Sequence, residues 1–127
     1  VYKVFEALKS GKADICKIKR VYRQDSFFRR LESSMYNLLY RVLFSLNLKD
    51  INGCPKIMKR EVLAALNPVS RDWFIDAELM IKAFRKKFKV MEIPVTYYRR
   101  NKGKSHVRLT TSVEFIKNAL KFKLRGY

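Results

Sequence analysis

A short turn in the middle of the chain carries a carboxylate and an ammonium group a few residues apart. Residues 49–58 are KDINGCPKIM, with Asp50 before the Asn52-Gly53 turn and Lys56 after it. This arrangement can direct both side chains into one cleft. An aspartate before a glycine turn also commonly caps its own backbone, so the motif alone leaves a purely local role for Asp50 open.

Two carboxylates follow a pair of aromatic residues at the start of a predicted helix. Residues 73–78 are WFIDAE, so Trp73 precedes the helix and Asp76 and Glu78 lie near its beginning. These acidic groups are candidates for chemistry. The simpler alternative is helix stabilisation, because a carboxylate at this position interacts favourably with the N-terminal helix dipole.

A basic loop later in the chain combines the groups that a diphosphate requires. Residues 99–106 are RRNKGKSH and follow the motif EIPV at 92–95. The loop offers guanidinium and ammonium groups, a hydroxyl and one glycine that allows close backbone approach. Its candidate binding residues are Arg100, Lys102, Lys104, Ser105 and His106. A solvated surface loop is the alternative.

Composition separates the question of fold from the question of charge. The chain has 127 residues, 29 Lys and Arg against 11 Asp and Glu, a net charge of +18, and 48% hydrophobic residues. The apolar content excludes a basic disordered tail, and the length allows one domain with one core. Residues 79–127 contain 14 basic and 2 acidic residues, so an anionic partner is expected mainly there.

Cysteine use indicates a reducing compartment. Cys16 and Cys54 form no CxxC pair and have no metal-ligand spacing to His106. Two free thiols favour a cytoplasmic location, either in solution or peripheral on the cytoplasmic face of a membrane. The chain begins at Val1 without an initiator methionine or a signal peptide, as a piece of a longer protein would.

The spacing of apolar residues predicts alternating helices and strands. The expected helices cover residues 1–9, 26–46 and 60–66, a stretch from about 74 or 76, and a stretch from about 111. The expected strands cover residues 14–21, 56–58 and 90–98, the first with one face more polar than the other. Pro94 has no N–H for a ladder hydrogen bond, so the last strand is expected at an edge or at a bend.

The helix predicted at 26–46 carries an apolar stripe and is apolar nearly all round in its second half. The stripe residues are Phe28, Leu31, Met35, Leu39, Val42 and Leu46. Polar interruptions make it too short to span a bilayer. It is either a buried core helix, or a helix that lies partly on a membrane or a partner, with Arg29, Arg30 and Arg41 near anionic head groups.

These elements predict an α/β fold that is short of strands. Three short strands beside so much helix suggest that the rest of a sheet lies in sequence before Val1. We therefore expect residues 1–127 to be a single partial domain with no second domain.

Taken in order, the four motifs resemble the C-terminal half of family 2 glycosyltransferases. The resemblance is particularly to the branch that includes dolichyl-phosphate mannose synthase and its polyprenyl-phosphate relatives. Its pattern reads roughly D-x-N/T-G-x-x-K, then aromatic-aromatic-x-D-x-E-L, then E-I-P-V, then R-x-x-G-x-S-K. The matching segments here are residues 50–56, 73–79, 92–95 and 100–106, and the resemblance covers nearly the whole chain. His106 departs from the usual Lys or Arg, which makes the charge at that position depend on pH.

The resemblance implies the C-terminal part of a GT-A fold, a Rossmann-like nucleotide-diphospho-sugar transferase, with its nucleotide-binding half missing. It implies an inverting transfer from a nucleotide-diphosphate sugar to a polyprenyl phosphate, a dolichyl phosphate or a glycan. In such an enzyme Asp76 would act as base or orient the acceptor, with Glu78 beside it and Asp50 on the acceptor side. Lys56 and the loop residues would bind substrate, and Trp73 would stack on a sugar.

The same resemblance implies a divalent metal, Mg or Mn, on the sugar-nucleotide diphosphate. Its ligands belong to a D-x-D motif that these 127 residues lack, so the chain by itself is not expected to turn over. An anionic membrane surface is a further expected partner.

Two other classes of protein compete with this interpretation. A nucleic-acid-binding module would use the +18 charge with the 7 Tyr and 9 Phe residues, but the sequence contains no helix-turn-helix, zinc-finger, RRM or KH signature. The third class is a non-catalytic scaffold derived from a glycosyltransferase and recruited to anionic membranes.

Overall fold

A computed structural model of the chain describes residues 1–21, 27–96, 98, 109–124 and 126. The elements in these ranges follow the predicted order, and the α/β class is confirmed. They are α1 (Tyr2–Lys9), β1 (Ile15–Val21), α2 (Phe27–Phe44), β2 (Lys56–Met58), α3 (Arg60–Leu66), α4 (Ile75–Arg85), β3 (Val90–Thr96) and α5 (Leu109–Leu124).

The three strands form one mixed sheet in the order β2-β1-β3. β1 pairs antiparallel with β2, with Ile15 opposite Met58, and parallel with β3, from Ile15 opposite Val90 to Val21 opposite Thr96. Within the described chain β3 is an edge strand, as Pro94 predicted. Both long strands therefore end at the same edge of the sheet, with Val21 opposite Thr96.

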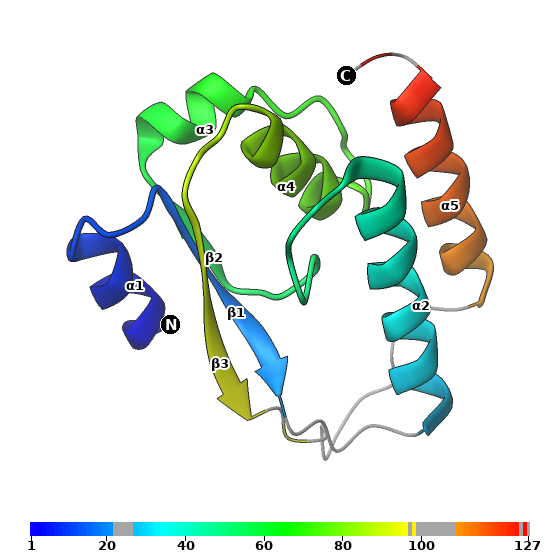
Figure 1. The fold of residues 1–127 in the computed structure, drawn as a ribbon, viewed down its shortest axis with the longest axis horizontal. Coiled ribbons are helices and arrows are strands. Elements are labelled where there is room, and N and C mark those ends of the chain that lie inside the picture. The colour runs from blue at the N-terminus through cyan, green and yellow to red at the C-terminus, as the bar shows by residue number, and fades with distance from the viewer. Residues whose placement is uncertain (22–26, 97, 99–108, 125, 127) are drawn as a thin grey trace.

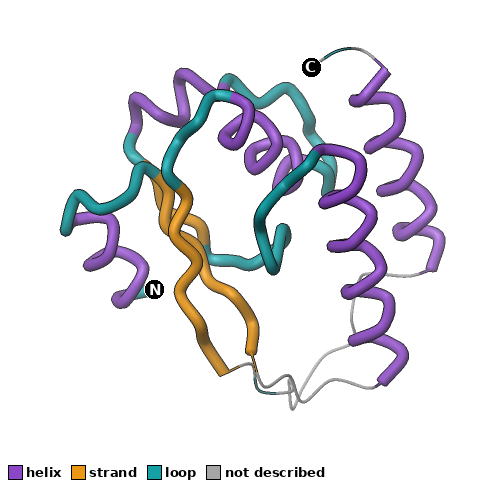
Figure 2. The backbone as a smooth tube through the Cα atoms, in the orientation of Figure 1, coloured by secondary structure: helices purple, strands orange, loops and turns teal. Residues whose placement is uncertain are grey.

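Side chains that alternate along the strands divide the apolar residues between two cores, one on each face of the sheet. Ile15, Met58 and Val90 belong to the larger core, which also contains residues from α2, α3, α4 and α5. Cys16 packs with Val4 of α1 in the smaller one. The molecule is thus layered, with α1 on one face of the sheet and the other helices on the opposite side (Figure 1, Figure 2).

Helix α2 packs on the core through only part of its apolar stripe. Leu31, Met35 and Val42 of the stripe are exposed by 47%, 63% and 72%, so the alternative of a fully buried helix is wrong at these positions. Leu39 and Leu46 do pack on the core, and the side chain of Phe28 lies outside the described residues. A helix that is apolar nearly all round gives no clear periodicity, and partners elsewhere in the chain select the face it buries.

Contacts between aromatic rings of α2 and α5 determine which face of α2 is buried. Tyr36, Tyr40 and Phe44 lie one turn apart on α2, where Tyr36 contacts Phe115 with ring centroids 5.3 Å apart and Phe44 contacts Phe122 at 6.3 Å. The Tyr40 hydroxyl donates a hydrogen bond to the Phe115 carbonyl at 3.1 Å. These contacts hold α2 and α5 side by side (Figure 1).

Several boundaries differ slightly from the prediction. α2 ends at Phe44 rather than near residue 46, because Ser45 has a left-handed backbone with φ 53°. β3 ends at Thr96, and α5 begins at Leu109, two residues before the predicted start. α3 and β2 have the predicted bounds, and Asn67 ends α3 in the left-handed conformation. No helix in the described ranges is long and apolar enough to cross a membrane.

The turn at Gly53 leaves no room for a side chain. A Cβ atom added there would lie 2.0 Å from the backbone oxygen of Ile18 and 3.1 Å from its carbonyl carbon. The Gly53 N–H also donates to the Asp50 carbonyl at 3.1 Å, which closes the turn. Glycine is therefore required at this position by close backbone approach.

We predict that Gly53→Ala lowers the free energy of unfolding by about 3 kcal/mol or more, because β1 and the turn must separate. Gly11→Ala is the control: Gly11 has φ 72° but open space around it, so only backbone strain of about 1 kcal/mol applies. Denaturant unfolding of both variants measures the difference. Equal losses would contradict the steric explanation.

Candidate functional site

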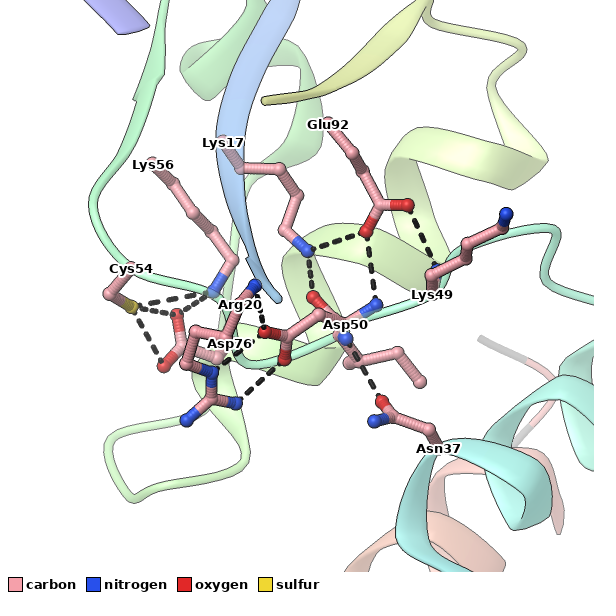
Figure 3. A network of polar contacts seen from close by, with 10 residues as sticks. Lys17, Arg20, Asn37, Lys49, Asp50, Cys54, Lys56, Asp76 and Glu92 are labelled. Atoms are coloured by element: carbon pink, nitrogen blue, oxygen red, sulfur yellow. Dashed lines mark hydrogen bonds and ion pairs between the residues drawn. The ribbon is translucent and has the colours of Figure 1, made fainter. Parts of the chain in front are cut away.

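Charged side chains from five segments converge beside β1 (Figure 3). Arg20 lies near the end of β1, Asp50 and Cys54 in the loop before β2, Lys56 on β2, Asp76 in the first turn of α4 and Glu92 on β3. The structure therefore brings together three residues that the sequence predicted, Asp50, Lys56 and Asp76. We refer to these six residues together with Lys17 as the charged cluster.

Asp50 is held by Arg20 in a bidentate ion pair. Arg20 donates from Nε to Oδ2 and from Nη2 to Oδ1, both at 2.7 Å, and its backbone N–H donates to Oδ2 at 3.1 Å. Burial acts to raise the pKa of Asp50, but the hydrogen bonds and positive charge of Arg20 outweigh it and hold that pKa below its ordinary value. The Asp50 carboxylate thus faces β1, where it accepts from Arg20, and does not cap the backbone of its own turn.

Lys17 and Glu92 fix the backbone on which Asp50 is carried. Lys17 is fully buried and donates to the Asp50 carbonyl oxygen and, at 3.3 Å, to Glu92 Oε1. Glu92 accepts from the backbone N–H groups of Lys49 at 2.9 Å and Asp50 at 3.0 Å. The more polar face expected of β1 is therefore not solvated: it buries an ammonium group and satisfies it with oxygen acceptors.

Burial lowers the pKa of Lys17, while the negative charges of Glu92 and Asp50 act to raise it. The nearby charge of Lys56 adds to the lowering, which places Lys56 within electrostatic range of Lys17. The charged groups around Asp50 therefore lie within electrostatic range of the Lys56 side chain that pairs with Asp76.

Asp76 forms the second half of the cluster with Lys56 and Cys54. Lys56, with a side chain only 5% exposed, forms an ion pair with Asp76, whose side chain is 31% exposed. The Cys54 thiol donates to both oxygens of Asp76 at 3.7 Å, and Lys56 Nζ lies 3.7 Å from the same sulfur. Burial raises the pKa of the Cys54 thiol, so it remains a protonated donor. Asp76 is thus oriented by Lys56 and Cys54 on one side and remains partly open to solvent.

Glu78 lies in a different set of contacts. It is fully buried and accepts from the backbone N–H groups of Val69 at 2.9 Å and Ser70 at 2.8 Å. Lys82, one turn later on α4, pairs with it at 2.6 Å. Burial acts to raise the pKa of Glu78, but the hydrogen bonds from Lys82 and Ser70 keep it below its usual range. Both oxygens are engaged in holding the chain before α4.

The remaining candidates are only partly placed. Trp73 is 60% exposed and directly precedes the helix that carries Asp76. Arg100, Lys102, Lys104, Ser105 and His106 lie outside the described residues.

Five contributors to the site were not assigned a role from the sequence. They are Lys17, Arg20, Cys54, Glu92 and Asn37, the last of which accepts from the Ile51 N–H at 3.0 Å. The signal for Lys17 was present, since a lone lysine lies between Cys16 and Ile18 in a strand that is otherwise apolar there. Arg20 and Cys54 have no distinguishing local pattern.

The chain has little else by which to assign a family or a metal. No group of three or more His, Cys, Asp or Glu residues in the described part of the chain could hold a metal ion. No family model matches the chain. The geometry of the charged cluster therefore carries the functional argument.

We predict that Asp50→Asn lowers the free energy of unfolding at neutral pH by about 2 kcal/mol, because the Arg20 pair loses its charge. The pKa of Asp50 is lowered from 3.8 in the folded state, so the stability it contributes is present above 3.8 and is lost as pH falls through the folded value. The difference between wild type and variant should therefore shrink in acid.

Thermal or denaturant unfolding between pH 7 and pH 2 measures this difference. Glu78 contributes in the same acid range, so the comparison is made between wild type and Asp50→Asn rather than from the wild-type curve alone. In an Arg20→Met background the Asp50→Asn change should lose most of its effect. A pH-independent difference would show that the ion pair is not its source.

Proposed function

We propose that this chain is the acceptor-side part of a glycosyltransferase catalytic domain of the GT-A type. More particularly, we infer an inverting transfer from a nucleotide-diphosphate sugar to a polyprenyl or dolichyl phosphate or another membrane-associated acceptor. The observation that carries the proposal is Asp76: an ionised carboxylate at the start of α4, oriented by Lys56 and Cys54 and open on one side. The four ordered motifs that place it there support the same class.

An inverting transfer needs a group opposite the departing nucleotide that can accept a proton or orient the acceptor. If the acceptor is a hydroxyl, Asp76 takes its proton. If the acceptor is a phosphate, the nucleophile is already an anion, and Asp76 with its partner Lys56 orients it. Lys56 suits the second role because its ammonium group can attract a phosphate while keeping Asp76 charged.

The leaving diphosphate requires positive charge, and the loop after β3 is the proposed source. Arg100, Lys102, Lys104 and Ser105 would contact the diphosphate, and His106 would add charge as pH falls. The parallel pairing of β1 with β3 supports this arrangement, since Val21 and Thr96 are opposite each other at the sheet end that carries Arg20.

A divalent metal would supply further charge stabilisation on the diphosphate when bound. The residues that would hold it belong to the half of the domain proposed to precede Val1. The described acidic residues of the cluster are paired with Arg20, Lys17 and Lys56 instead.

A lipid-borne acceptor requires the protein to reach a membrane surface, and two helices present suitable side chains. α2 and α5 lie side by side, and each exposes large apolar residues along its length (Figure 1). These residues are Phe27, Leu31, Met35, Leu38 and Val42 on α2, and Val113, Ile116, Leu120 and Leu124 on α5. Exposed basic residues Arg30, Arg41, Lys117, Lys121 and Lys123 accompany them.

We call these two exposed faces the helical apolar surface and assign an anionic lipid surface as its partner. Apolar side chains flanked by lysine and arginine suit the boundary between acyl chains and acidic head groups. Such an arrangement favours the membrane alternative for the exposed side of α2, while Tyr36, Tyr40 and Phe44 on its other side serve the core.

A nucleic-acid-binding module gains less support from the same observations. Base stacking requires exposed aromatic rings. Tyr40, Phe74, Phe115 and Phe122 are buried. The exposed rings of Tyr2, Phe5, Phe27, Trp73 and Tyr98 are distributed over α1, α2 and the segments before α4 and after β3. Binding to nucleic acid with a steep salt dependence would nevertheless favour that class.

We predict that Asp76→Asn in the complete protein abolishes sugar transfer and leaves nucleotide binding intact. The amide can neither accept the acceptor proton nor pair ionically with Lys56, whereas the nucleotide contacts lie elsewhere. Turnover of a nucleotide-sugar donor measures the first effect and calorimetric titration of the nucleotide the second. Turnover near the wild-type rate would remove Asp76 from the mechanism.

Glu78→Gln is the matched control, two residues away on the same helix. Because Glu78 holds the backbone of Val69 and Ser70, its loss should reduce stability and the folded fraction. The rate per folded molecule should change much less than in Asp76→Asn.

For the helical apolar surface we predict that the double change Met35→Glu and Leu38→Glu weakens binding to anionic vesicles by at least about tenfold. Both side chains are exposed, by 63% and 59%, so folding should be unaffected. Leu63→Glu on α3, 44% exposed, is the control and should bind like wild type. Co-sedimentation with phosphatidylglycerol vesicles measures this, and equal binding of all three proteins would contradict the assignment.

A further inference from the structure

Two turns lie side by side at the end of the sheet where β1 and β3 begin, opposite the end that carries Arg20. Residues 10–14 connect α1 to β1, and residues 86–89 connect α4 to β3 (Figure 1). The N–H groups of Asp14 and Ile15 donate to the Lys89 carbonyl at 2.9 and 3.1 Å, and the Lys89 N–H donates to Asp14 Oδ2 at 2.8 Å. These hydrogen bonds fix the two turns to each other.

Exposed basic side chains gather on these turns and on the helix ends beside them. We call this set the basic surface; it consists of Lys9, Lys12, Arg85, Lys86, Lys87 and Lys89. Within the described chain none of the six forms an ion pair with a carboxylate. Asp14, in the first turn, is partly buried and already accepts the Lys89 N–H. The described part of the protein therefore leaves the charge of the basic surface uncompensated.

Lys87 occupies a backbone position that favours glycine. Its φ is 58°, and two hydrogen bonds close the end of α4 around it, from the Lys87 N–H to the Phe84 carbonyl and from the Phe88 N–H to the Ala83 carbonyl, both at 3.0 Å. Helices that end in this way commonly have glycine at the left-handed position, because a Cβ atom there is strained. A lysine at this position costs stability, and what it adds is one exposed ammonium group on the basic surface.

We propose that the basic surface binds an extended acidic segment of another protein. Five of its six cations are lysines, and a lysine ammonium is a compact charge that pairs with single carboxylates rather than through a fixed planar fork. The cations follow one another along two adjacent turns and the ends of α1 and α4. Glutamate and aspartate side chains spaced along an extended chain match such a row, and attraction between the opposite charges speeds their encounter.

Two other anionic partners suit this surface less well. A membrane is bound most strongly where large apolar side chains accompany the cations, and single-stranded nucleic acid requires exposed rings for base stacking. In residues 9–14 and 84–89 the large apolar side chain that is exposed is Phe84, by 39%. One partly exposed ring can pack against an apolar side chain of a peptide, whereas it supports neither insertion into lipid nor the stacking of successive bases.

The basic surface is remote from the candidate functional site. Asp76 lies in the first turn of α4 and Lys86 directly follows the helix, so about 15 Å of helix separates them. A bound acidic segment would therefore leave Asp76 accessible to substrate. The inference does not depend on sugar transfer, and failure of either proposal would leave the other intact.

Fluorescence anisotropy with a labelled decapeptide of alternating glutamate and serine tests the proposal. The peptide should bind the protein at low ionic strength and more weakly as salt is added, because exposed charges are screened. An oligouridylate and phosphatidylglycerol vesicles are the competing probes. Absence of peptide binding at low ionic strength would overturn the proposal.

The triple change Lys86→Gln, Lys87→Gln and Lys89→Gln should weaken peptide binding at least about tenfold, because three exposed ion pairs are lost. The backbone hydrogen bonds between the two turns do not involve these side chains, so the fold should be kept, which circular dichroism checks. A larger loss for the oligouridylate or the vesicles than for the peptide would assign the surface to nucleic acid or to a membrane and overturn the proposal.

The matched control removes the same charge from exposed lysines elsewhere. It is the triple change Lys117→Gln, Lys121→Gln and Lys123→Gln on α5, which should bind the peptide nearly as tightly as wild type. Equal losses in the two triple variants would show that net charge alone attracts the peptide, and the proposal would fail.

Lys87→Gly separates binding from stability. Glycine relieves the left-handed backbone, so the midpoint of urea unfolding should rise, while the loss of one ammonium group should weaken peptide binding about twofold to threefold. A variant that is more stable and binds the peptide as wild type does would contradict the proposed role of Lys87.

Discussion

One buried ammonium group organises the centre of this molecule. Lys17 is fully buried on β1, and a buried positive charge is tolerated only where oxygen acceptors replace its water. The Asp50 carbonyl and the Glu92 carboxylate are those acceptors. Because Glu92 also accepts from the backbone of Lys49 and Asp50, a single requirement for charge compensation joins β1, β3 and the loop between α2 and β2.

The position of the candidate site follows from the contacts by which Lys17 and Glu92 connect β1, β3 and the loop before β2. Once residues 49 and 50 are held, the Gly53 turn passes directly against the Ile18 carbonyl, and the chain can only continue into β2, where Lys56 lies beside Asp76. The same device recurs at α4, where the buried carboxylate of Glu78 holds two backbone N–H groups. Carboxylates that bind backbone amides therefore position both the charged cluster and the segment that leads into α4. Rigid support of this kind is what a binding group needs to keep its orientation.

The sequence predicted the parts of this arrangement that depend on local pattern. The helices and strands, the edge position of Pro94, and the grouping of Asp50, Lys56 and Asp76 all follow from periodicity, turn residues or ordered motifs. The burial of Lys17 could not be predicted, since its acceptors are contributed by residues 33 and 75 positions away. Which face of α2 packs could not be predicted for a similar reason: Phe115 and Phe122, far along the chain, decide it. The family resemblance placed Glu78 beside Asp76, and in the structure Glu78 is buried and binds the backbone of Val69 and Ser70.

The use of acidic residues also explains why so large a positive charge remains available. Four acidic residues, Asp50, Asp76, Glu78 and Glu92, are paired with Arg20, Lys56, Lys82 and Lys17, and these pairs hold backbone or orient a carboxylate. Asp14 and Asp72 likewise accept backbone N–H groups. The chain has only 11 acidic residues against 29 basic ones. The acidic residues that form these internal contacts do not neutralise the basic residues at the surface. The folded chain therefore presents its excess charge outward, and long-range attraction brings anionic ligands or anionic membranes to it faster than neutral ones, an effect that weakens as ionic strength rises.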